Sequence, residues 1–257
     1  MMRSTQTTNE FQCIQRSFDA PLALVTGASG GIGGCCAKTL AGLGYATLIV
    51  GRSLRDLGTV ADDINNRFGD THPCFVYRAD LANRQEVALL LTHLESFKAP
   101  EVFVSAAGVT SNSTETFDEH ELDEVFAVNT IAPMYLARGI LPLMENGKGG
   151  YIINIASRAG VLAFSDKGVY GASKASTIRY FDALYVKSLN SDIRVTSICP
   201  GWVNTPMAKA GGCTKPSDDL LQPDDISAAI GWLVSSPSRV RIRELVIEAG
   251  GKSQVTA

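Results

Sequence analysis

A serine, a tyrosine and a lysine near the middle of the chain could together move a proton. Tyr170 and Lys174 are four residues apart, so both project from one face if Tyr170 opens a helix. A free phenol has a pKa of about 10, and an adjacent ammonium favours its ionised form. Ser157 follows the apolar run 151–155, which predicts a buried strand. Tyr170 is therefore a candidate general acid or base, although a YxxxK pair alone also occurs in helices without such a role.

A second segment has the composition of a phosphate-binding turn. The apolar run 22–25 leads into TGASGGIG at 26–33 and then into helical spacing over 35–43. Glycines let a backbone turn tightly and approach a pyrophosphate, and the following helix offers free N–H groups at its N-terminus. A flexible connection is the alternative for a glycine-rich loop. Its place between a strand and a helix favours a dinucleotide site.

The residues after the next two strands bear on which nucleotide is bound. The strand 46–50 ends in Gly51, Arg52 and Ser53, with no acid to hold a ribose 2′-hydroxyl. Arg52 could bind a 2′-phosphate through its planar fork, the alternative being a solvated arginine. After strand 74–77, Asp80 could accept a hydrogen bond from an adenine or cap the next helix. The pattern favours NADP(H), with NAD(H) possible.

Strand and helix patterns alternate along the chain, which predicts one α/β domain. Right-handed crossovers then produce a parallel sheet with helices on both faces, a doubly wound Rossmann fold of seven strands. Pro133 is expected to bend one long helix. The strands are expected at 22–25, 46–50, 74–77, 102–108, 151–155, 193–198 and 244–247, and the helices at 35–43, 54–68, 86–97, 117–144, 170–189 and 224–234.

Composition narrows the class of protein further. The 257 residues are 45% hydrophobic and 19% charged with a net charge of −3, which is typical of a globular domain and gives no basic footprint for nucleic acid. The six cysteines do not have the spacing of metal ligands, so no metal site is expected. They also lack the density of a disulfide scaffold, so a reducing, cytoplasmic location is expected. No apolar run reaches the ~20 residues that span a bilayer. Residues 1–20 are expected to be a polar extension before the domain 21–257, their acids disfavouring a transit peptide.

With these motifs in order, the chain resembles the short-chain dehydrogenase/reductase family from about Leu22 to Gly251. TGASGGIG fits the family's TGxxxGxG loop, and Asp80 with Leu81 fits its adenine-site pair. The resemblance implies a catalytic set of Asn129, Ser157, Tyr170 and Lys174. It implies cofactor contacts from Gly27, Ser29, Gly30, Gly31, Ile32, Gly33, Arg52, Ser53, Asp80, Leu81, Ala106, Ala107, Gly108, Tyr170, Lys174, Pro200, Gly201, Val203 and Thr205.

One motif departs from the family's pattern. The usual NNAG stands here as SAAG at 105–108, so two amide side chains are lost and their hydrogen bonds must be replaced. The segment RIRELVI at 241–247 also differs from the family's commoner ending. We expect cofactor binding to survive because Gly108 and the backbone can still line it.

The resemblance implies hydride transfer between a nicotinamide and a carbonyl carbon. Tyr170 would exchange the proton at the substrate oxygen, Ser157 would hydrogen-bond that oxygen, Lys174 would lower the pKa of Tyr170 and hold the ribose, and Asn129 would position a relay water. The expected protein is an NADPH-dependent reductase of ketones or 3-oxoacyl groups. An NAD-dependent alcohol dehydrogenase of the family, a non-catalytic NADP(H) sensor and a methyltransferase are the alternatives.

The substrate side of the site is less sharply defined. Residues 202–223 are rich in glycine and proline, which is typical of a lid. Val161, Leu162 and Phe164 are expected to help shape an apolar pocket for a small-molecule carbonyl or alcohol substrate. The family further suggests a homodimer or homotetramer built on the helices that contain Asn129 and Tyr170, where Gly171, Ala172 and Ala175 would permit close packing.

Overall fold

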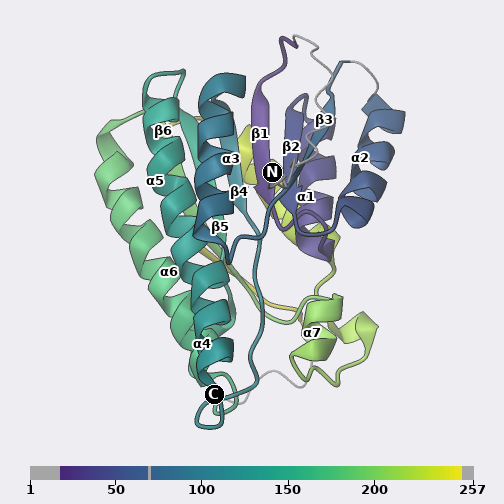
Figure 1. Cartoon of the computed structure of the whole chain (residues 1–257), viewed down its shortest axis with the longest axis vertical. Coiled ribbons are helices and arrows are strands. Elements are labelled where there is room, and N and C mark those ends of the chain that lie inside the picture. Colours follow the sequence, from purple (N-terminus) through teal and green to yellow (C-terminus); the bar gives the residue numbers. More distant parts are fainter. Residues whose placement is uncertain (1–17, 69–70, 251–257) are drawn as a thin grey trace, which may run out of the picture.

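A computed structural model describes residues 18–68 and 71–250. Its centre is one seven-stranded sheet in the order β3-β2-β1-β4-β5-β6-β7, in which all neighbouring strands are parallel (Figure 1). This confirms the predicted doubly wound α/β fold. The strands are β1 Leu22–Thr26, β2 Ala46–Gly51, β3 Cys74–Arg78, β4 Pro100–Ser105, β5 Gly150–Ile155, β6 Ile193–Pro200 and β7 Glu244–Ile247.

Helices cover both faces of this sheet because its central strands are apolar on both sides. All five residues of β1 and all six of β2 are buried. One face packs against α1, α2 and α8, and the other against α3, α5 and α6, so the core is divided into two layers. The helices are α1 Gly31–Gly42, α2 Leu54–Phe68, α3 Arg84–Phe97, α4 Glu119–Phe126, α5 Ala132–Glu145, α6 Gly168–Lys187, α7 Pro206–Ala210 and α8 Pro223–Ser235.

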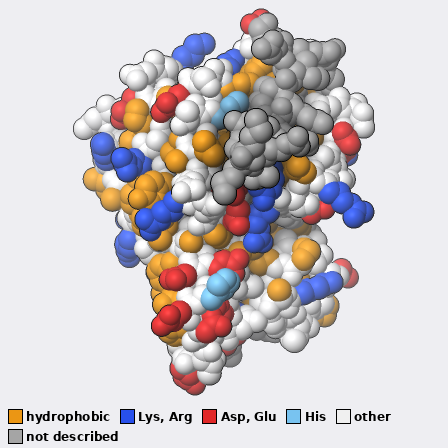
Figure 2. Space-filling model, viewed as in Figure 1, with side chains coloured by type: hydrophobic (Ala, Val, Ile, Leu, Met, Phe, Trp, Pro, Cys, Tyr) orange, Lys and Arg blue, Asp and Glu red, His pale blue; other side chains and the backbone are white. Residues whose placement is uncertain are grey.

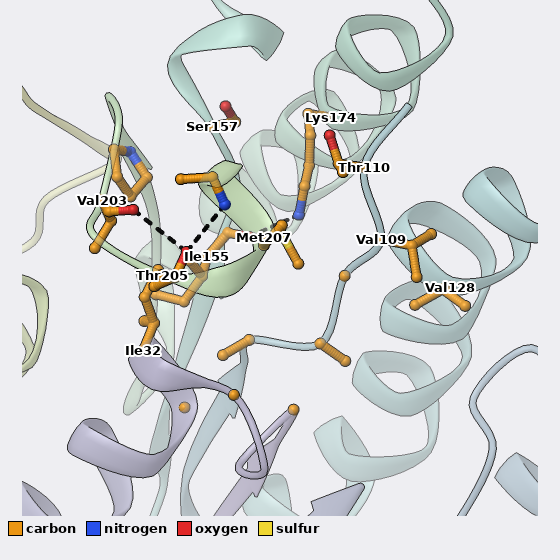
Figure 3. A pocket seen from close by; sticks show the side chains of 18 of the residues that line it. Ile32, Val109, Thr110, Val128, Ile155, Ser157, Lys174, Val203, Thr205 and Met207 are labelled. Carbon is orange, nitrogen blue, oxygen red and sulfur yellow. Dashed lines mark hydrogen bonds between the residues drawn. The ribbon is translucent and has the colours of Figure 1, made fainter. Parts of the chain in front are cut away.

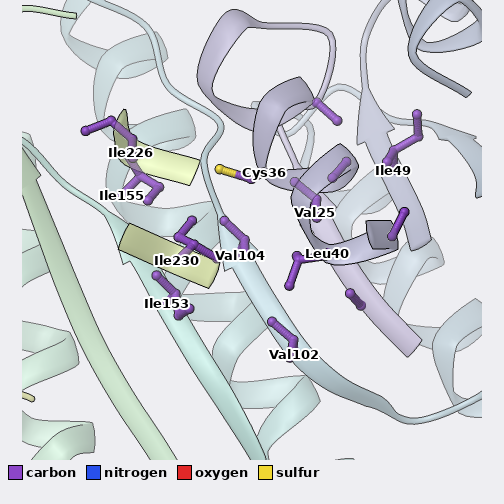
Figure 4. Close-up of a cluster of buried hydrophobic side chains, with 14 of the residues drawn as sticks. Val25, Cys36, Leu40, Ile49, Val102, Val104, Ile153, Ile155, Ile226 and Ile230 are labelled. Carbon is purple, nitrogen blue, oxygen red and sulfur yellow. The ribbon is translucent and has the colours of Figure 1, made fainter. Parts of the chain in front are cut away.

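The first layer shows how the sheet and helices interlock. Side chains of alternate strand residues, among them Val25, Val104 and Ile153, meet Leu40 of α1 and Ile230 of α8 (Figure 4). These side chains have no more than 1% of their surface exposed. Because aliphatic side chains fill this layer, the strand ends are fixed relative to one another, and so are the loops that follow them.

The long helix predicted over 117–144 is divided, contrary to the sequence-based expectation. A π-helical turn, Ala127–Ile131, separates α4 from α5. Pro133 lies in the first turn of α5, where its missing N–H costs little, so the irregularity precedes the proline. Pro133 has no N–H to donate to the carbonyl four residues before it, which belongs to Asn129, and the Thr177 hydroxyl donates to that carbonyl at 2.7 Å instead. The prediction missed this turn because its sequence, AVNTI, has ordinary helical spacing.

The segment after β6 is closed at its base by two backbone hydrogen bonds. Asn204 N donates to the Leu221 carbonyl at 2.7 Å, and Leu221 N donates to the Trp202 carbonyl at 3.1 Å. Between them lie α7 and a 3₁₀ turn, Ser217–Asp219. Figure 1 shows α7 set apart from the layers around the sheet. The predicted loop 202–223 is thus a structured excursion that returns to its starting point.

The segment before β1 is held against the domain. Phe18 packs on Phe75 and Phe97, with ring centres 5.3 and 5.7 Å apart. The Lys98 ammonium donates to the Ala20 carbonyl at 2.7 Å. Ordered packing therefore begins before residue 21, and the rest of the proposed extension, 1–17, lies outside the described residues. Among the helices of 18–68 and 71–250, none has the length and apolarity needed to cross a membrane.

Candidate active site

A cavity of about 450 Å³ opens at the carboxyl ends of the strands. It brings together the glycine turn after β1, the residues after β2, β3 and β4, Ser157 after β5, and the segment after β6. This is where ligands of open α/β sheets bind. The predicted cofactor residues that line it are Gly27, Ser29, Gly30, Gly31, Ile32, Gly33, Arg52, Asp80, Leu81, Ala106, Ala107, Gly108, Tyr170, Lys174, Pro200, Gly201, Val203 and Thr205.

Close backbone contacts shape the end of the cavity at the glycine turn. Gly27 has φ +68°, and a Cβ atom there would lie 2.6 Å from the Ala107 Cα. A Cβ atom at Gly33 would lie 2.4 Å from the Gly27 carbonyl oxygen. Side chains at either position would force the turn away from β4 or from α1. The turn is thus a cradle of bare backbone at a helix N-terminus, which fits the pyrophosphate of a dinucleotide.

The lost amides of the SAAG segment are compensated by a threonine. The Thr26 hydroxyl accepts hydrogen bonds from Ala106 N at 3.2 Å and Ala107 N at 3.4 Å. Thr26 is fully buried at the end of β1, so these bonds tie the glycine turn to the end of β4. The cavity wall is therefore intact without the usual asparagines.

Arg52 lies at the far end of this cavity. Its side chain is 63% exposed, and its guanidinium is 3.6 Å from the Glu124 carboxylate. Ser53, by contrast, does not line the cavity: its hydroxyl accepts from Asp56 N at 3.3 Å in the first turn of α2. Ser53 thus begins a helix, and its contact with the cofactor stays a prediction.

Asp80 lines the cavity and does not cap α3. Its carboxylate accepts from Ala82 N at 3.0 Å, while the cap of α3 is Asn83, which accepts from Gln85 N at 2.9 Å. Glu86 accepts from Asp80 N at 2.8 Å and fixes the turn. Of the two roles open to Asp80 from the sequence, the helix cap is therefore wrong.

Ser157, Tyr170 and Lys174 meet on one wall of the cavity. Ser157 follows β5, and its hydroxyl accepts from Ala159 N at 3.1 Å. Tyr170 lies in the first turn of α6, and Lys174 follows one turn later with its ammonium donating to the Ile155 carbonyl at 3.0 Å. Figure 3 shows Lys174 and Ser157 on this wall, with Thr205 and Met207 from the segment after β6 nearby. The predicted cluster of hydroxyl, phenol and ammonium is present.

The electrostatics of this cluster differ from the expectation. Burial raises the pKa of Tyr170, and a hydrogen bond with Ser157 opposes that rise. Burial also lowers the pKa of Lys174 to about 8. The Lys174 ammonium is 6.0 Å from the centre of the Tyr170 ring, and burial rather than this cation decides the direction in which the phenol pKa shifts. Tyr170 is thus kept protonated near neutrality, the state required of a proton donor.

Asn129 acts on the wall from behind and does not itself line the cavity. Its amide accepts from Val109 N at 2.8 Å and donates to the Val109 carbonyl at 2.9 Å, which fixes the chain after Gly108. A Cβ atom at Gly108 would lie 3.3 Å from the Asn129 oxygen and 3.5 Å from the Lys174 ammonium. Asn129 therefore positions the segment beside Lys174.

Several lining residues were not identified from the sequence. Phe164 lines the cavity as expected, but Val161 and Leu162 do not and are 43% and 49% exposed. Lys167 lines it and is only 6% exposed. The sequence did offer a signal, since Lys167 is three residues before Tyr170 on the loop that enters the catalytic helix. A lysine there either faces solvent or contributes to the site.

The family model for short-chain dehydrogenases matches residues 21–214. The chain belongs to the short-chain dehydrogenase family. It is 33% identical over 229 residues to an uncharacterized oxidoreductase of Staphylococcus saprophyticus, covering 88% of this chain and 96% of the relative. It is 28% identical over 249 residues to a 7alpha-hydroxysteroid dehydrogenase of Bacteroides fragilis, covering 91% and 95%.

A solved structure supports the same assignment. An alcohol dehydrogenase from Thermococcus sibiricus, complexed with 5-hydroxy-NADP, superposes with a TM-score of 0.81 at 27% identity, covering 89% of this chain and 96% of that one. As a short-chain dehydrogenase, this protein is an oxidoreductase that binds a nicotinamide cofactor and acts on CH–OH or C=O groups.

Proposed function

We propose that this short-chain dehydrogenase is an NADPH-dependent reductase that converts a ketone or 3-oxoacyl group to a secondary alcohol. The observation that carries the proposal is the position of Tyr170, whose pKa is raised by burial, beside Ser157 on the wall of a cavity that also contains the glycine cradle. A raised phenol pKa suits a proton donor, and reduction is the direction in which a donor is needed.

The chain's own residues divide the work at the reacting carbonyl. NADPH, when bound, supplies the hydride to the carbonyl carbon. Tyr170 gives its proton to the carbonyl oxygen, and the Ser157 hydroxyl donates a hydrogen bond to that oxygen as negative charge develops. Lys174 lies within the same wall and holds the ribose, while Asn129 fixes the adjoining backbone and supports a relay water. One hydride and one proton thus turn C=O into CH–OH.

The preference for NADPH is supported by Arg52 at the far end of the cavity. Its exposed guanidinium follows β2, where an acid would otherwise hold a ribose 2′-hydroxyl. A guanidinium binds a phosphate through two parallel hydrogen bonds. The Thermococcus sibiricus structure contains an NADP derivative, which agrees with this proposal. An NAD-dependent alcohol dehydrogenase is the alternative within the family.

The deciding experiment measures NADPH oxidation through its absorbance in the presence of ketones or 3-oxoacyl thioesters. It compares the wild type with Tyr170→Phe. We expect Tyr170→Phe to lose turnover by about 10²- to 10⁴-fold, the range that general acids contribute. NADPH binding, measured by the enhancement of its fluorescence, should be unchanged. Retained turnover in the variant would refute the role of Tyr170, and NADPH binding without turnover of any carbonyl compound would favour a sensor.

We also infer assembly into a homodimer or homotetramer. Hydrophobic side chains gather at the left of the face in Figure 2, over the helices α5 and α6 of Figure 1. Tyr135 of α5 is 41% exposed and Val186 of α6 is 63% exposed. Light scattering that gave the mass of one chain would refute this inference. The cytoplasmic location inferred from the cysteines stays a prediction.

A further inference from the structure

Lys167 is a buried cation on the wall of the catalytic cavity. Its ammonium donates to the Gly211 carbonyl at 2.7 Å and to the side-chain oxygen of Asn112. Both partners are neutral, and so is the Trp202 ring, whose centre lies 5.8 Å from the ammonium and attracts it only weakly at that distance. The one carboxylate within salt-bridge distance among the described residues is Asp166, at 3.5 Å, and its side chain is 65% exposed. Water and salt screen such an exposed acid, so its compensation of the buried charge is weak.

Holding the segment after β6 does not explain this charge. Asn112 connects the segment after β4 to the segment after β6 without help from Lys167, because its amide donates to the Ala210 carbonyl at 2.8 Å. A neutral donor at position 167 could make the bond to the Gly211 carbonyl equally well. A lysine costs more, since an ammonium removed from water needs an opposite charge. The lysine is accounted for if the missing negative charge comes from the substrate.

The charges elsewhere on the cavity wall agree with this reading. Arg158, directly after Ser157, lines the cavity with its guanidinium 5.4 Å from the centre of the Phe164 ring. Its Nε atom is 2.8 Å from the Glu248 carboxylate, which is 38% exposed. Within the described residues, the lining acids are Asp166 and Asp80, and Asp80 lies after β3, away from this wall. Positive charge thus predominates beside the catalytic residues.

Building on the proposed function, we propose that the substrate is a carbonyl compound with a carboxylate, and that Lys167 binds that carboxylate. The carbonyl lies at Ser157 and Tyr170, and the apolar walls from Phe164 and Met207 contact the carbon chain between the two groups. Lys167 is then a specificity-determining residue three positions before the proton donor, at the N-cap of the helix that carries Tyr170. The step at the carbonyl is unchanged.

Steady-state kinetics with matched substrates test this proposal. Oxo-acids such as 4-oxopentanoate, 5-oxohexanoate and longer or aryl-substituted homologues are compared with their methyl esters at saturating NADPH. Wild type should prefer the acids in kcat/KM. Lys167→Gln keeps a donor but removes the charge, so it should lower kcat/KM for the acid by about 10- to 100-fold, as expected for a lost charge-assisted hydrogen bond, and change the ester by less than about threefold.

Two further variants separate charge from position. Lys167→Arg should restore most of the preference for acids. Asn204→Ala loosens the base of the segment after β6, where the Asn204 amide donates to the Gln222 side chain at 3.1 Å, without removing a partner of Lys167, so it should change acid and ester alike. The proposal would be overturned if the wild type preferred the esters, or if Lys167→Gln lowered kcat/KM equally for acid and ester. Lys167 would then only hold the segment after β6 in place.

A binding measurement distinguishes failure of this proposal from failure of the proposed function. NADPH-loaded Tyr170→Phe is titrated with each oxo-acid and its ester, following NADPH fluorescence. If the acid binds more tightly than the ester and Lys167→Gln removes this difference, the carboxylate site is supported. This holds even if the wild type reduces no compound, a result that would refute the reductase but not the carboxylate site. Equal or absent binding of acid and ester overturns the carboxylate site, and turnover of neutral ketones would still support the reductase.

Discussion

The two ends of the cavity are built by different means. At the glycine turn, backbone packs on backbone, and a Cβ atom at Gly27 or Gly33 would lie under 3 Å from its neighbours. At the substrate end, side chains from loops form the wall, and Trp202, Met207 and Phe164 are each 38–39% exposed. The first end is fixed by steric contact and therefore suits one constant ligand. The second can change its side chains without disturbing the fold, which suits a variable substrate.

Replacing Gly27 should break the rigid end. Gly27→Ala places a methyl group against Ala107 at a positive φ, and overpacking plus the left-handed strain should cost at least ~3 kcal/mol of unfolding free energy. Gly212→Ala is the matched control: its φ is +83°, but no atom lies within 4 Å of its Cβ position, so a loss of only ~1 kcal/mol is expected. Urea denaturation measures both. Equal losses would show that strain, not packing, makes Gly27 necessary.

The pH dependence of stability should report the burial of Lys174. Its folded-state pKa is about 8 against an ordinary 10.5, so between these values the unfolded chain binds more protons and stability rises with pH. Between pH 8 and 10.5, the unfolding free energy of the wild type should rise by up to about 3 kcal/mol relative to that of Lys174→Met. Chemical denaturation across that range measures the difference. A flat difference would mean that the ammonium is hydrated in solution.

A smaller effect should sharpen the contrast within the cofactor end itself. Arg52 is exposed, unlike the glycine cradle, so Arg52→Ala should leave stability within about 0.5 kcal/mol. Arg52→Ala should weaken the binding of NADPH by about tenfold, because the contact with the phosphate is lost, and should leave the affinity for NADH unchanged. Arg55→Ala, an exposed arginine on α2, serves as control. Titration of cofactor fluorescence gives both affinities, and a parallel loss of NADH would contradict the assignment.

The smallest effect on stability is expected at the substrate end. Met207→Ala removes an exposed lining side chain, so unfolding free energy should change by less than about 1 kcal/mol and NADPH affinity should not change. The KM for the carbonyl substrate should change by several-fold, because the wall is altered where the substrate lies. Kinetics and denaturation on the same preparation test this. A large loss of stability would show that the loop is part of the core.

How far the sequence predicted the structure follows the same contrast. The strand ends and the glycine turn could be predicted, because apolar runs and glycines record backbone constraints that depend on nearby residues. The cluster of Ser157, Tyr170 and Lys174 was predicted from the resemblance to the family, since the spacing of Tyr170 and Lys174 alone is not specific. The raised pKa of Tyr170 could not be predicted, since it depends on burial by segments distant in sequence. Lys167 and Asn112 were missed for the same reason: their partners lie 44 or more positions away.

Ser53 and Asp80 show what counting from a strand end leaves open. Both were predicted to contact the cofactor; Asp80 lines the cavity, whereas the Ser53 hydroxyl accepts from Asp56 N at the start of α2. The end of a strand shows where a ligand can lie, but not which of the next side chains form hydrogen bonds with the local backbone.

The π-helical turn Ala127–Ile131 has a consequence for how the chain can change length. A π-helical turn contains about one residue more than an α-helical turn, so losing one residue there should convert the turn to α-helix and rotate α4 against α5 only slightly. Losing one residue within α5, which is α-helical throughout, should instead rotate the two parts of that helix against each other by about 100°. The turn is therefore the place along α4 and α5 where the chain can shorten by one residue with the least disturbance of the core.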